Sequence, residues 1–135
     1  MSTKIVLASG VFDVIHPGHL AYLAEARKHG DRLVVVVTSD EQAAREKRPP
    51  RHPIADRAVA IAGLEPVDEA FAGPEPYDLA GTVRRAGASV IALGHDQPFD
   101  ERKLTDELAA ADLKVEVVRC GEYPSVRTSE LLQRD

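Results

Sequence analysis

The sequence predicts an α/β fold: a single doubly wound domain with a five-stranded, mainly parallel sheet. Short, nearly continuous apolar runs recur along the chain, as in strands that are buried on both faces of a sheet. Segments with helical periodicity separate these runs, so strands and helices alternate. The length of 135 residues suits one hydrophobic core, and we see no repeat or linker. We therefore expect one doubly wound domain over residues 1–135.

The elements follow from the apolar pattern, taken in chain order. The strands are expected at residues 5–8, 33–37, 67–71, 90–93 and 115–118, of which 67–71 is the weakest candidate. The helices are expected at residues 17–29, 39–47, 54–64, 77–86 and 100–111, with a short one near the C-terminus. The carboxyl ends of such strands are where ligands bind in a sheet of this kind. The loops of interest are therefore 9–17, 38–40, 72–76, 94–99 and 121–128.

Residues at the element boundaries support these assignments. Pro17 suits the first turn of a helix, and Gly30 suits its left-handed end. Ser39, followed three residues later by Gln42, resembles a capping box after the second strand. Proline and glycine also bound the third and fourth helices, at Pro53 and Gly87.

Composition excludes several classes of protein. Hydrophobic residues make up 44% and charged residues 29% of the chain, as in an ordinary soluble domain. The net charge of −5 argues against broad binding to duplex nucleic acid. One cysteine excludes an intramolecular disulfide framework, and there is no apolar signal core or membrane-length apolar run. We therefore expect a cytoplasmic protein without nucleic-acid or membrane partners.

The loop 9–17 and the helix start after it carry the most specific signal, the string Gly10-Val-Phe-Asp-Val-Ile-His16-Pro-Gly18-His19. Gly10 lets the backbone approach a ligand closely. Pro17 and Gly18 place exposed backbone N–H groups at a helix start, where the dipole favours an anion. His16 and His19 can face the same side, where two imidazoles can donate hydrogen bonds to phosphate oxygens.

Two other interpretations of this loop stay open. Pro17 and Gly18 can simply shape a turn while both histidines cap the helix. The histidines can also form a metal pair, but that pair needs a third ligand. The remaining donors have no characteristic spacing for one: His29, His52, His95, Cys120 and carboxylates. We therefore favour phosphate binding and expect no protein-held metal.

The whole string resembles the G-x-F-D-x-x-H-x-G-H signature of the cytidylyltransferase-like nucleotidyltransferases, which lies between the first strand and first helix of a Rossmann-like sheet. The segment Leu93-Gly-His-Asp-Gln-Pro-Phe-Asp-Glu101 is similar to the G-x-D-Q-x-F-D-E stretch of archaeal FAD synthases, which are FMN adenylyltransferases. Ser125-Val-Arg-Thr-Ser-Glu130 resembles the element that opens the last helix in these enzymes and in glycerol-3-phosphate cytidylyltransferases. The resemblance covers essentially the whole chain.

The resemblance implies that His16 and His19 contact the nucleotide phosphates and stabilise the transition state. The nucleotide is expected to bind along the same loop, at Gly10, Val11, Phe12, Pro17 and Gly18. A basic segment, Lys47-Arg-Pro-Pro-Arg-His52, is similar to one from which a cation reaches the triphosphate. Lys47 is our catalytic candidate there, with Arg48 and Arg51 as alternatives, and a solvated loop is the competing interpretation.

The other site candidates follow the last two strands. Gly94 and Asp96 follow the strand at 90–93, where Asp96 can accept hydrogen bonds from a ribose or base, lie near Mg²⁺, or form a turn. Arg127 has the planar fork for bidentate phosphate contact. Thr128 and Ser129 can bind the nucleotide or cap the last helix, and Tyr123 can stack on the nucleotide or pack.

Two further side chains are assigned supporting roles. Asp13 is expected to orient the histidine loop by accepting backbone N–H bonds. Cys120, at the end of a buried strand, is expected to pack.

The candidate residues suit nucleotidyl transfer, which needs two polyanions aligned and their developing charge neutralised. We expect Mg²⁺ or another divalent cation to accompany the nucleotide. ATP with FMN as the acceptor is favoured, and CTP with glycerol 3-phosphate is the alternative. A non-catalytic nucleotide-binding module and a flavodoxin-like carrier are the other classes considered. A homodimer is left open.

Overall fold

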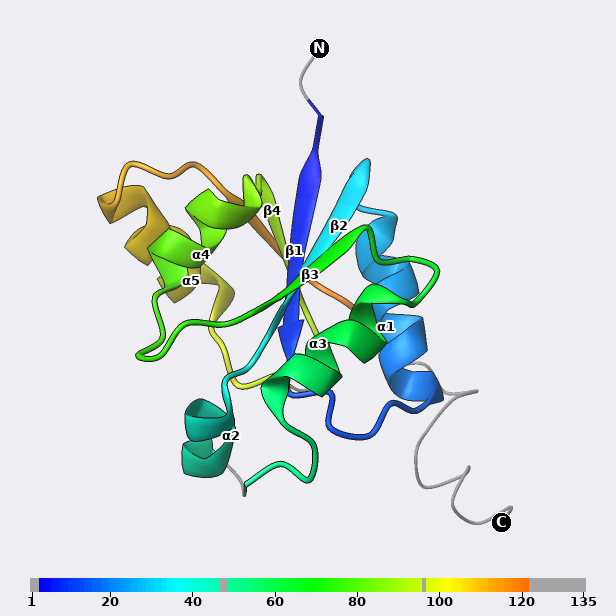
Figure 1. The fold of residues 1–135 in the computed structure, drawn as a ribbon. Coiled ribbons are helices and arrows are strands. Elements are labelled where there is room, and N and C mark those ends of the chain that lie inside the picture. Colours follow the sequence, from blue (N-terminus) through cyan, green and yellow to red (C-terminus); the bar gives the residue numbers. More distant parts are fainter. Residues whose placement is uncertain (1–2, 47–48, 96, 122–135) are drawn as a thin grey trace.

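The computed structural model describes residues 3–46, 49–95 and 97–121 and has a central sheet with helices on both faces (Figure 1). Its strands are β1 (Ile5–Gly10), β2 (Arg32–Val37), β3 (Glu69–Ala72), β4 (Val90–Leu93) and β5 (Glu116–Arg119). Its helices are α1 (Pro17–Arg27), α2 (Asp40–Glu46), α3 (Ile54–Ala62), α4 (Leu79–Ala86) and α5 (Glu101–Ala110). The ten elements expected within these ranges are present, and the short C-terminal helix lies outside the described residues.

The sheet has the strand order β3-β2-β1-β4-β5, and each neighbouring pair is parallel. β1 runs two residues beyond the predicted 5–8 because Ser9 and Gly10 pair with Val36 and Val37 of β2. The strand order reverses between β1 and β4, which makes their carboxyl ends the topological switch point of the sheet.

The hydrophobic core lies in two layers, one on each face of the sheet. Along β1, Val6 belongs to the layer that contains Leu23 of α1, while Leu7 belongs to the layer that contains Val83 of α4 and Leu108 of α5. Successive side chains of a strand point to opposite faces, so this alternation buries both faces of the central strand. The prediction of a doubly wound α/β fold is confirmed.

Most of the predicted boundaries are found. Pro17 is the first helical residue of α1, and Gly87 ends α4 with a left-handed φ of 67°. The Ser39 Oγ accepts the Gln42 N–H at 3.0 Å, as a capping box requires. The Gln42 side chain donates to Glu46 instead of returning to Ser39, so only half of that box forms.

Gly30 does not end α1 in a left-handed conformation, so this expectation is wrong. The cap residue of α1 is Lys28, with an ordinary right-handed φ of −71°. A Cβ on Gly30 would come within 2.6 Å of the Lys4 carbonyl oxygen and 2.8 Å of the Val6 side chain. Glycine at this position therefore permits a close approach to β1. Within the described ranges, no helix combines the length and apolarity needed to cross a bilayer.

Candidate active site

The loop between β1 and α1 leaves the sheet at the switch point, and its backbone is held in place. The Gly10 carbonyl accepts the Thr38 N–H at 2.9 Å. Phe12 has a left-handed φ of 51°, and its ring is buried in the core. A Cβ on Gly10 would come within 2.7 Å of that ring. Glycine at this position therefore leaves room for Phe12, in addition to the expected close approach to a ligand.

His16 and His19 meet at the N-terminus of α1, as their spacing predicts. His16 is the N-cap residue, and its Nδ1 accepts the Gly18 N–H at 3.1 Å. The Nδ1 of His19 accepts the His16 N–H at 3.3 Å, which completes a reciprocal capping box. The two rings stack with their centroids 3.7 Å apart, and the His19 ring meets the Phe12 ring edge to face at 5.2 Å.

The capping contacts fix the tautomer of both imidazoles. A ring nitrogen that accepts a hydrogen bond carries no proton, so each neutral ring has its proton on Nε2. The main chain therefore selects the form in which Nε2 is a donor, and a phosphate oxygen requires a donor. The capping interpretation and the phosphate interpretation are compatible, because they use different nitrogens of the same rings.

The helix start differs from our expectation in one respect. Pro17 has no N–H, the Gly18 N–H donates to His16 Nδ1, and the His19 N–H donates to the His16 carbonyl. The first amides of α1 are therefore engaged within the cap and are not exposed for an anion. The imidazoles replace them as the donors at this helix end.

Arg57 of α3 joins the histidine loop to two other loops. Its side chain is 1% exposed and ion-pairs with Asp40 at the start of α2. The guanidinium also donates to the carbonyl oxygens of Val11, Thr38 and His52, at 2.7, 2.9 and 3.0 Å. One buried cation therefore holds the loops that follow β1 and β2 and the loop that precedes α3.

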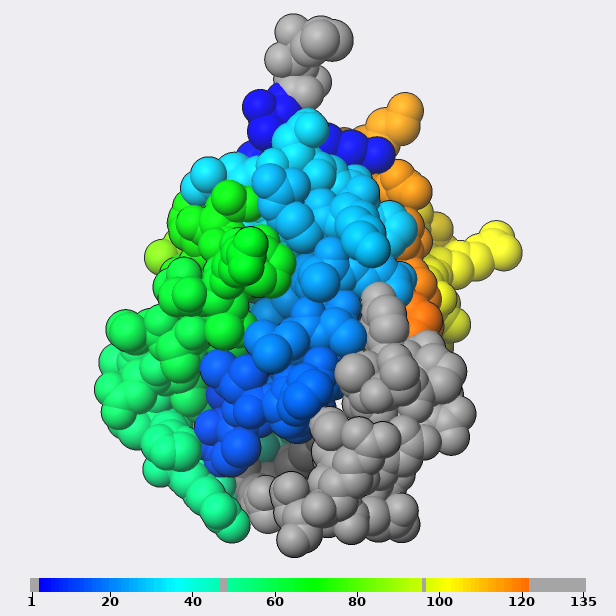
Figure 2. Space-filling model, turned by 90° about the vertical axis from the view of Figure 1, so that its right-hand side faces the viewer, coloured from blue at the N-terminus to red at the C-terminus, as the bar shows by residue number. Residues whose placement is uncertain are grey.

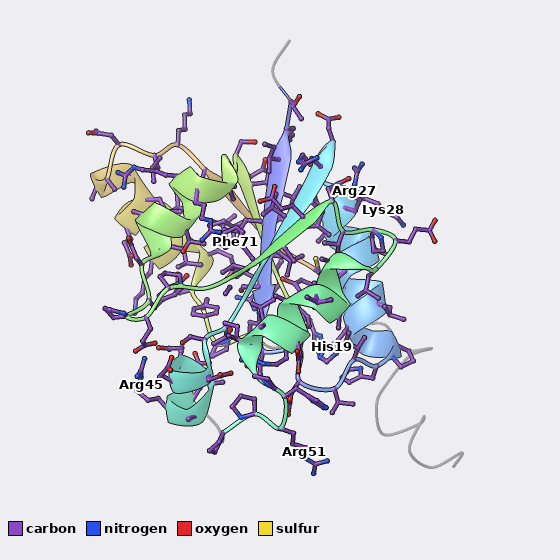
Figure 3. The ribbon with its side chains drawn as sticks, in the orientation of Figure 1. His19, Arg27, Lys28, Arg45, Arg51 and Phe71 are labelled. Carbon is purple, nitrogen blue, oxygen red and sulfur yellow. The ribbon has the colours of Figure 1, made fainter. Side chains whose placement is uncertain are left out.

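Asp13 accepts backbone N–H bonds as expected, but from a different loop. Its carboxylate accepts the N–H groups of Arg51 and His52 at 2.9 and 3.0 Å and contacts the His52 ring nitrogen Nδ1 at 3.1 Å. The Arg51 N–H, with that of His52, holds the pKa of Asp13 below its usual range. Asp13 therefore ties the histidine loop to the segment before α3. Figure 3 shows His19, Arg51 and Arg45 at the same end of the molecule.

Two polar side chains, Gln97 and Arg119, hold the loop after β4 in place. Gln97 accepts the Gly94 N–H at 2.9 Å and donates to the Ser9 carbonyl of β1 at 3.1 Å, so it bridges the switch point. Arg119 of β5 donates to the Gly94 and Gln97 carbonyls at 2.9 and 2.8 Å and pairs with Glu101. The Arg119 guanidinium holds the pKa of Glu101 below its usual range.

A hollow adjoins the histidine loop on the side of α3. It is lined by residues of both segments: Phe12, Asp13, Ile15, His52, Asp56, Arg57 and Ala60. This concave surface and the histidine pair therefore share one loop.

Several predicted site residues lie outside the described residues: Lys47, Arg48, Asp96, Tyr123, Arg127, Thr128 and Ser129. The described candidates at the switch point are the histidine loop and Gly94. Sequence reasoning missed Arg57 and Arg119. The sequence does contain an indication of Arg57, because its spacing of four from Ile61 places a charge on the apolar face of the predicted helix. In the structure both residues are buried.

Comparisons with known proteins agree with this geometry. The cytidylyltransferase-like family matches residues 7–134. A protein from Methanoregula boonei named FAD synthase is 42% identical over 123 residues, which are 91% of this chain and 82% of that protein. A Ferroglobus placidus protein with the same name is 46% identical over 116 residues, 86% of this chain and 75% of that protein.

A solved structure also matches closely. The crystal structure of the lipopolysaccharide core biosynthesis protein from Thermoplasma volcanium is 38% identical and has a TM-score of 0.87. The match covers 90% of this chain and 99% of that one. From the sequence match and the shared fold, this chain belongs to the cytidylyltransferase-like family.

Proposed function

We propose that this chain is an FMN adenylyltransferase, which transfers the AMP group of ATP to FMN and so forms FAD and pyrophosphate. Two similar proteins that cover most of the chain carry the name FAD synthase. The observation that carries the proposal in the structure is the stacked His16–His19 pair at the switch point, with Nδ1 of each ring held by a backbone N–H.

In the proposed reaction an oxygen of the FMN phosphate attacks the α-phosphorus of ATP. A new P–O bond forms, the bond from that phosphorus to the oxygen bridging to the β-phosphate breaks, and pyrophosphate leaves. The phosphomonoester needs no general base, because its second pKa is about 6 and it is already a dianion near neutral pH. The protein has to align the two anions and stabilise the charge that develops on the oxygens.

We assign that stabilisation to the Nε2–H groups of His16 and His19, with Lys47 and Arg127 as the cations. The nucleotide is proposed to bind along Gly10–Phe12 and at Gly94. Beside Pro17 and Gly18, the imidazoles and not the helix amides are proposed as its donors. Further contacts are proposed from Asp96, Tyr123, Thr128 and Ser129.

Mg²⁺ is proposed to arrive with the nucleotide. Asp13, Asp40 and Glu75, which lie near the carboxyl ends of β1, β2 and β3, already bond to protein donors. In the described part of this edge, these three carboxylates therefore hold loops together and do not form a ready-made set of Mg²⁺ ligands. Mg²⁺ is commonly bound through substrate phosphates and one or two carboxylates. The ion would neutralise triphosphate charge, and Asp96 is the candidate for a direct contact.

A pyrophosphate-release panel tests the proposal. It crosses ATP and CTP with FMN, glycerol 3-phosphate and phosphopantetheine, all with Mg²⁺, and chromatography identifies the nucleotide product. We expect pyrophosphate and FAD in equal amounts from ATP with FMN. Pyrophosphate from CTP with glycerol 3-phosphate, and none from ATP with FMN, would reassign the substrates within the family. Binding of nucleotide without pyrophosphate under any condition would favour a non-catalytic module.

A further inference from the structure

A second group of chemically active side chains lies where the end of α1 meets the end of β5. Glu25 lies in the last part of α1, His29 follows the helix, and Cys120 follows β5. Figure 2 shows the residues near 120, in orange, beside the light blue second half of α1. A carboxylate oxygen of Glu25, a ring nitrogen of His29 and the Sγ of Cys120 all lie within 4.8 Å of one another.

The main chain holds two of these three groups in position. The Cys120 N–H donates to the Leu93 carbonyl at 2.8 Å, which fixes Cys120 to the end of β4. The Gly121 N–H donates to Glu25 Oε2 at 3.2 Å, which fixes the carboxylate beside the thiol. Cys120 is buried, whereas Glu25 and His29 are partly exposed, so an ion has a route to the cluster from the surface.

We propose that Glu25, His29 and Cys120 form a transition-metal site, of the type that takes Zn²⁺ or Co²⁺, separate from the nucleotide site. One thiolate, one imidazole and one carboxylate are a donor set for these ions, with water as a fourth ligand. Bonds of about 2.0–2.3 Å to a tetrahedral ion place neighbouring donor atoms roughly 3.5 Å apart. Rotation of the partly exposed His29 side chain would shorten the present spacing toward that value.

A carboxylate oxygen of Glu25 and the Sγ of Cys120 lie within 4.8 Å of each other. Ligation of an ion at this spacing requires the Cys120 thiol to give up its proton. A metal ion would replace that proton, because the thiolate and not the thiol is the ligand. A carboxylate has two oxygens and several lone pairs, so Glu25 can keep its bond to Gly121 and still bind an ion.

The site is distant from the histidine pair although both involve α1. His19 lies in the first turn of α1, whereas His29 lies beyond its last turn, and a helix of eleven residues is about 16 Å long. Figure 3 shows the labelled His19 and Lys28 at opposite ends of the helix. An ion at the second site would join the end of α1 to the chain directly before Tyr123 and Arg127, which are proposed to bind the nucleotide.

Cobalt titration of protein freed of metal by a chelator, without oxygen, tests the site. We expect one Co²⁺ per chain, with the near-ultraviolet charge-transfer band of a cobalt–thiolate bond and the visible bands of tetrahedral coordination. Zn²⁺ should abolish these bands, while a large excess of Mg²⁺ should not, because Mg²⁺ prefers oxygen ligands. Absence of the charge-transfer band would overturn the proposal.

Matched variants assign the ligands. Cys120→Ala should abolish the charge-transfer band, and His29→Ala should weaken Co²⁺ binding at least about tenfold. His29 is partly exposed, so its variant keeps the test valid if Cys120→Ala fails to fold. Lys28→Ala, beside His29, should bind Co²⁺ as the wild type does. His16→Ala should keep the band while losing FAD formation, which separates this site from the proposed function. A band that persists in Cys120→Ala, or unchanged affinity in His29→Ala, would refute the ligand assignment.

Discussion

Replacing His16 by asparagine separates its capping role from its proposed catalytic role. The Oδ1 of asparagine occupies nearly the position of the imidazole Nδ1, so His16→Asn can still accept the Gly18 N–H. It removes the Nε2–H donor, which is the atom proposed to contact phosphate. His16→Ala removes both functions. The two variants therefore differ in the cap alone.

The free energy of unfolding and kcat/KM are expected to change by different amounts in these variants. Losing an N-cap acceptor costs about 1 kcal/mol, so His16→Ala should lower the free energy of unfolding by that amount and His16→Asn by less than about 0.5 kcal/mol. Losing a transition-state donor should lower kcat/KM by two or more orders of magnitude, roughly 3 kcal/mol, in both variants.

Urea unfolding followed by circular dichroism measures the first quantity, and FAD formation from ATP and FMN measures the second. Near-wild-type kcat/KM in folded His16→Asn would refute the catalytic role and leave His16 as a helix cap. Equal losses of stability in the two variants would refute the capping argument instead.

Three further predictions concern the loops. Arg57→Met should lower the free energy of unfolding by about 3–5 kcal/mol, mainly because three main-chain carbonyls lose their donor, and Asp40, which is partly exposed, loses its ion pair. Exposed Arg45→Met should cost under about 1 kcal/mol in the same urea assay. Gly10→Ala should lower the melting temperature, because its Cβ would meet the Phe12 ring; an unchanged value would contradict this. The lowered pKa of Asp13 means that its bonds to the segment before α3 persist above the ordinary carboxyl pKa and are lost as pH falls through the lowered value. Asp13→Asn keeps one acceptor oxygen where the carboxylate has two. At neutral pH it should speed hydrogen exchange at the amides of residues 51 and 52, and unchanged rates would refute the role of Asp13 in holding that segment.

The sheet was predictable because buried parallel strands leave long apolar runs in the sequence. β2 is almost entirely buried, and its run of valines has no competing interpretation. β3 was the weakest prediction because Phe71 is its one buried residue and it lies at the edge of the sheet. The wrong prediction for Gly30 has a physical reason. The space at Gly30 is limited by Lys4, which lies far away in sequence, and the pattern of residues in the helix carries no information about that contact.

The histidine pair was predictable because both residues and their capping hydrogen bonds lie within one turn of helix. Arg57 was not, since its carbonyl acceptors are 5, 19 and 46 residues away in sequence. A main-chain carbonyl has the same chemistry at each residue, so such contacts leave no pattern of residue types. A buried charge on the apolar face of a predicted helix is the trace that remains.

Two arginines bracket the switch point and act in the same way. Arg57 binds carbonyls on the side of β1 and β2, and Arg119 binds carbonyls of the loop after β4. Buried Arg57 and partly exposed Arg119 both hold the loops through main-chain oxygens, while the capping box holds Nδ1 of each histidine. The donors proposed to contact the phosphates are thus oriented before substrate binds. Binding energy is then not consumed in ordering these loops, and it can contribute to aligning the two phosphates for in-line attack.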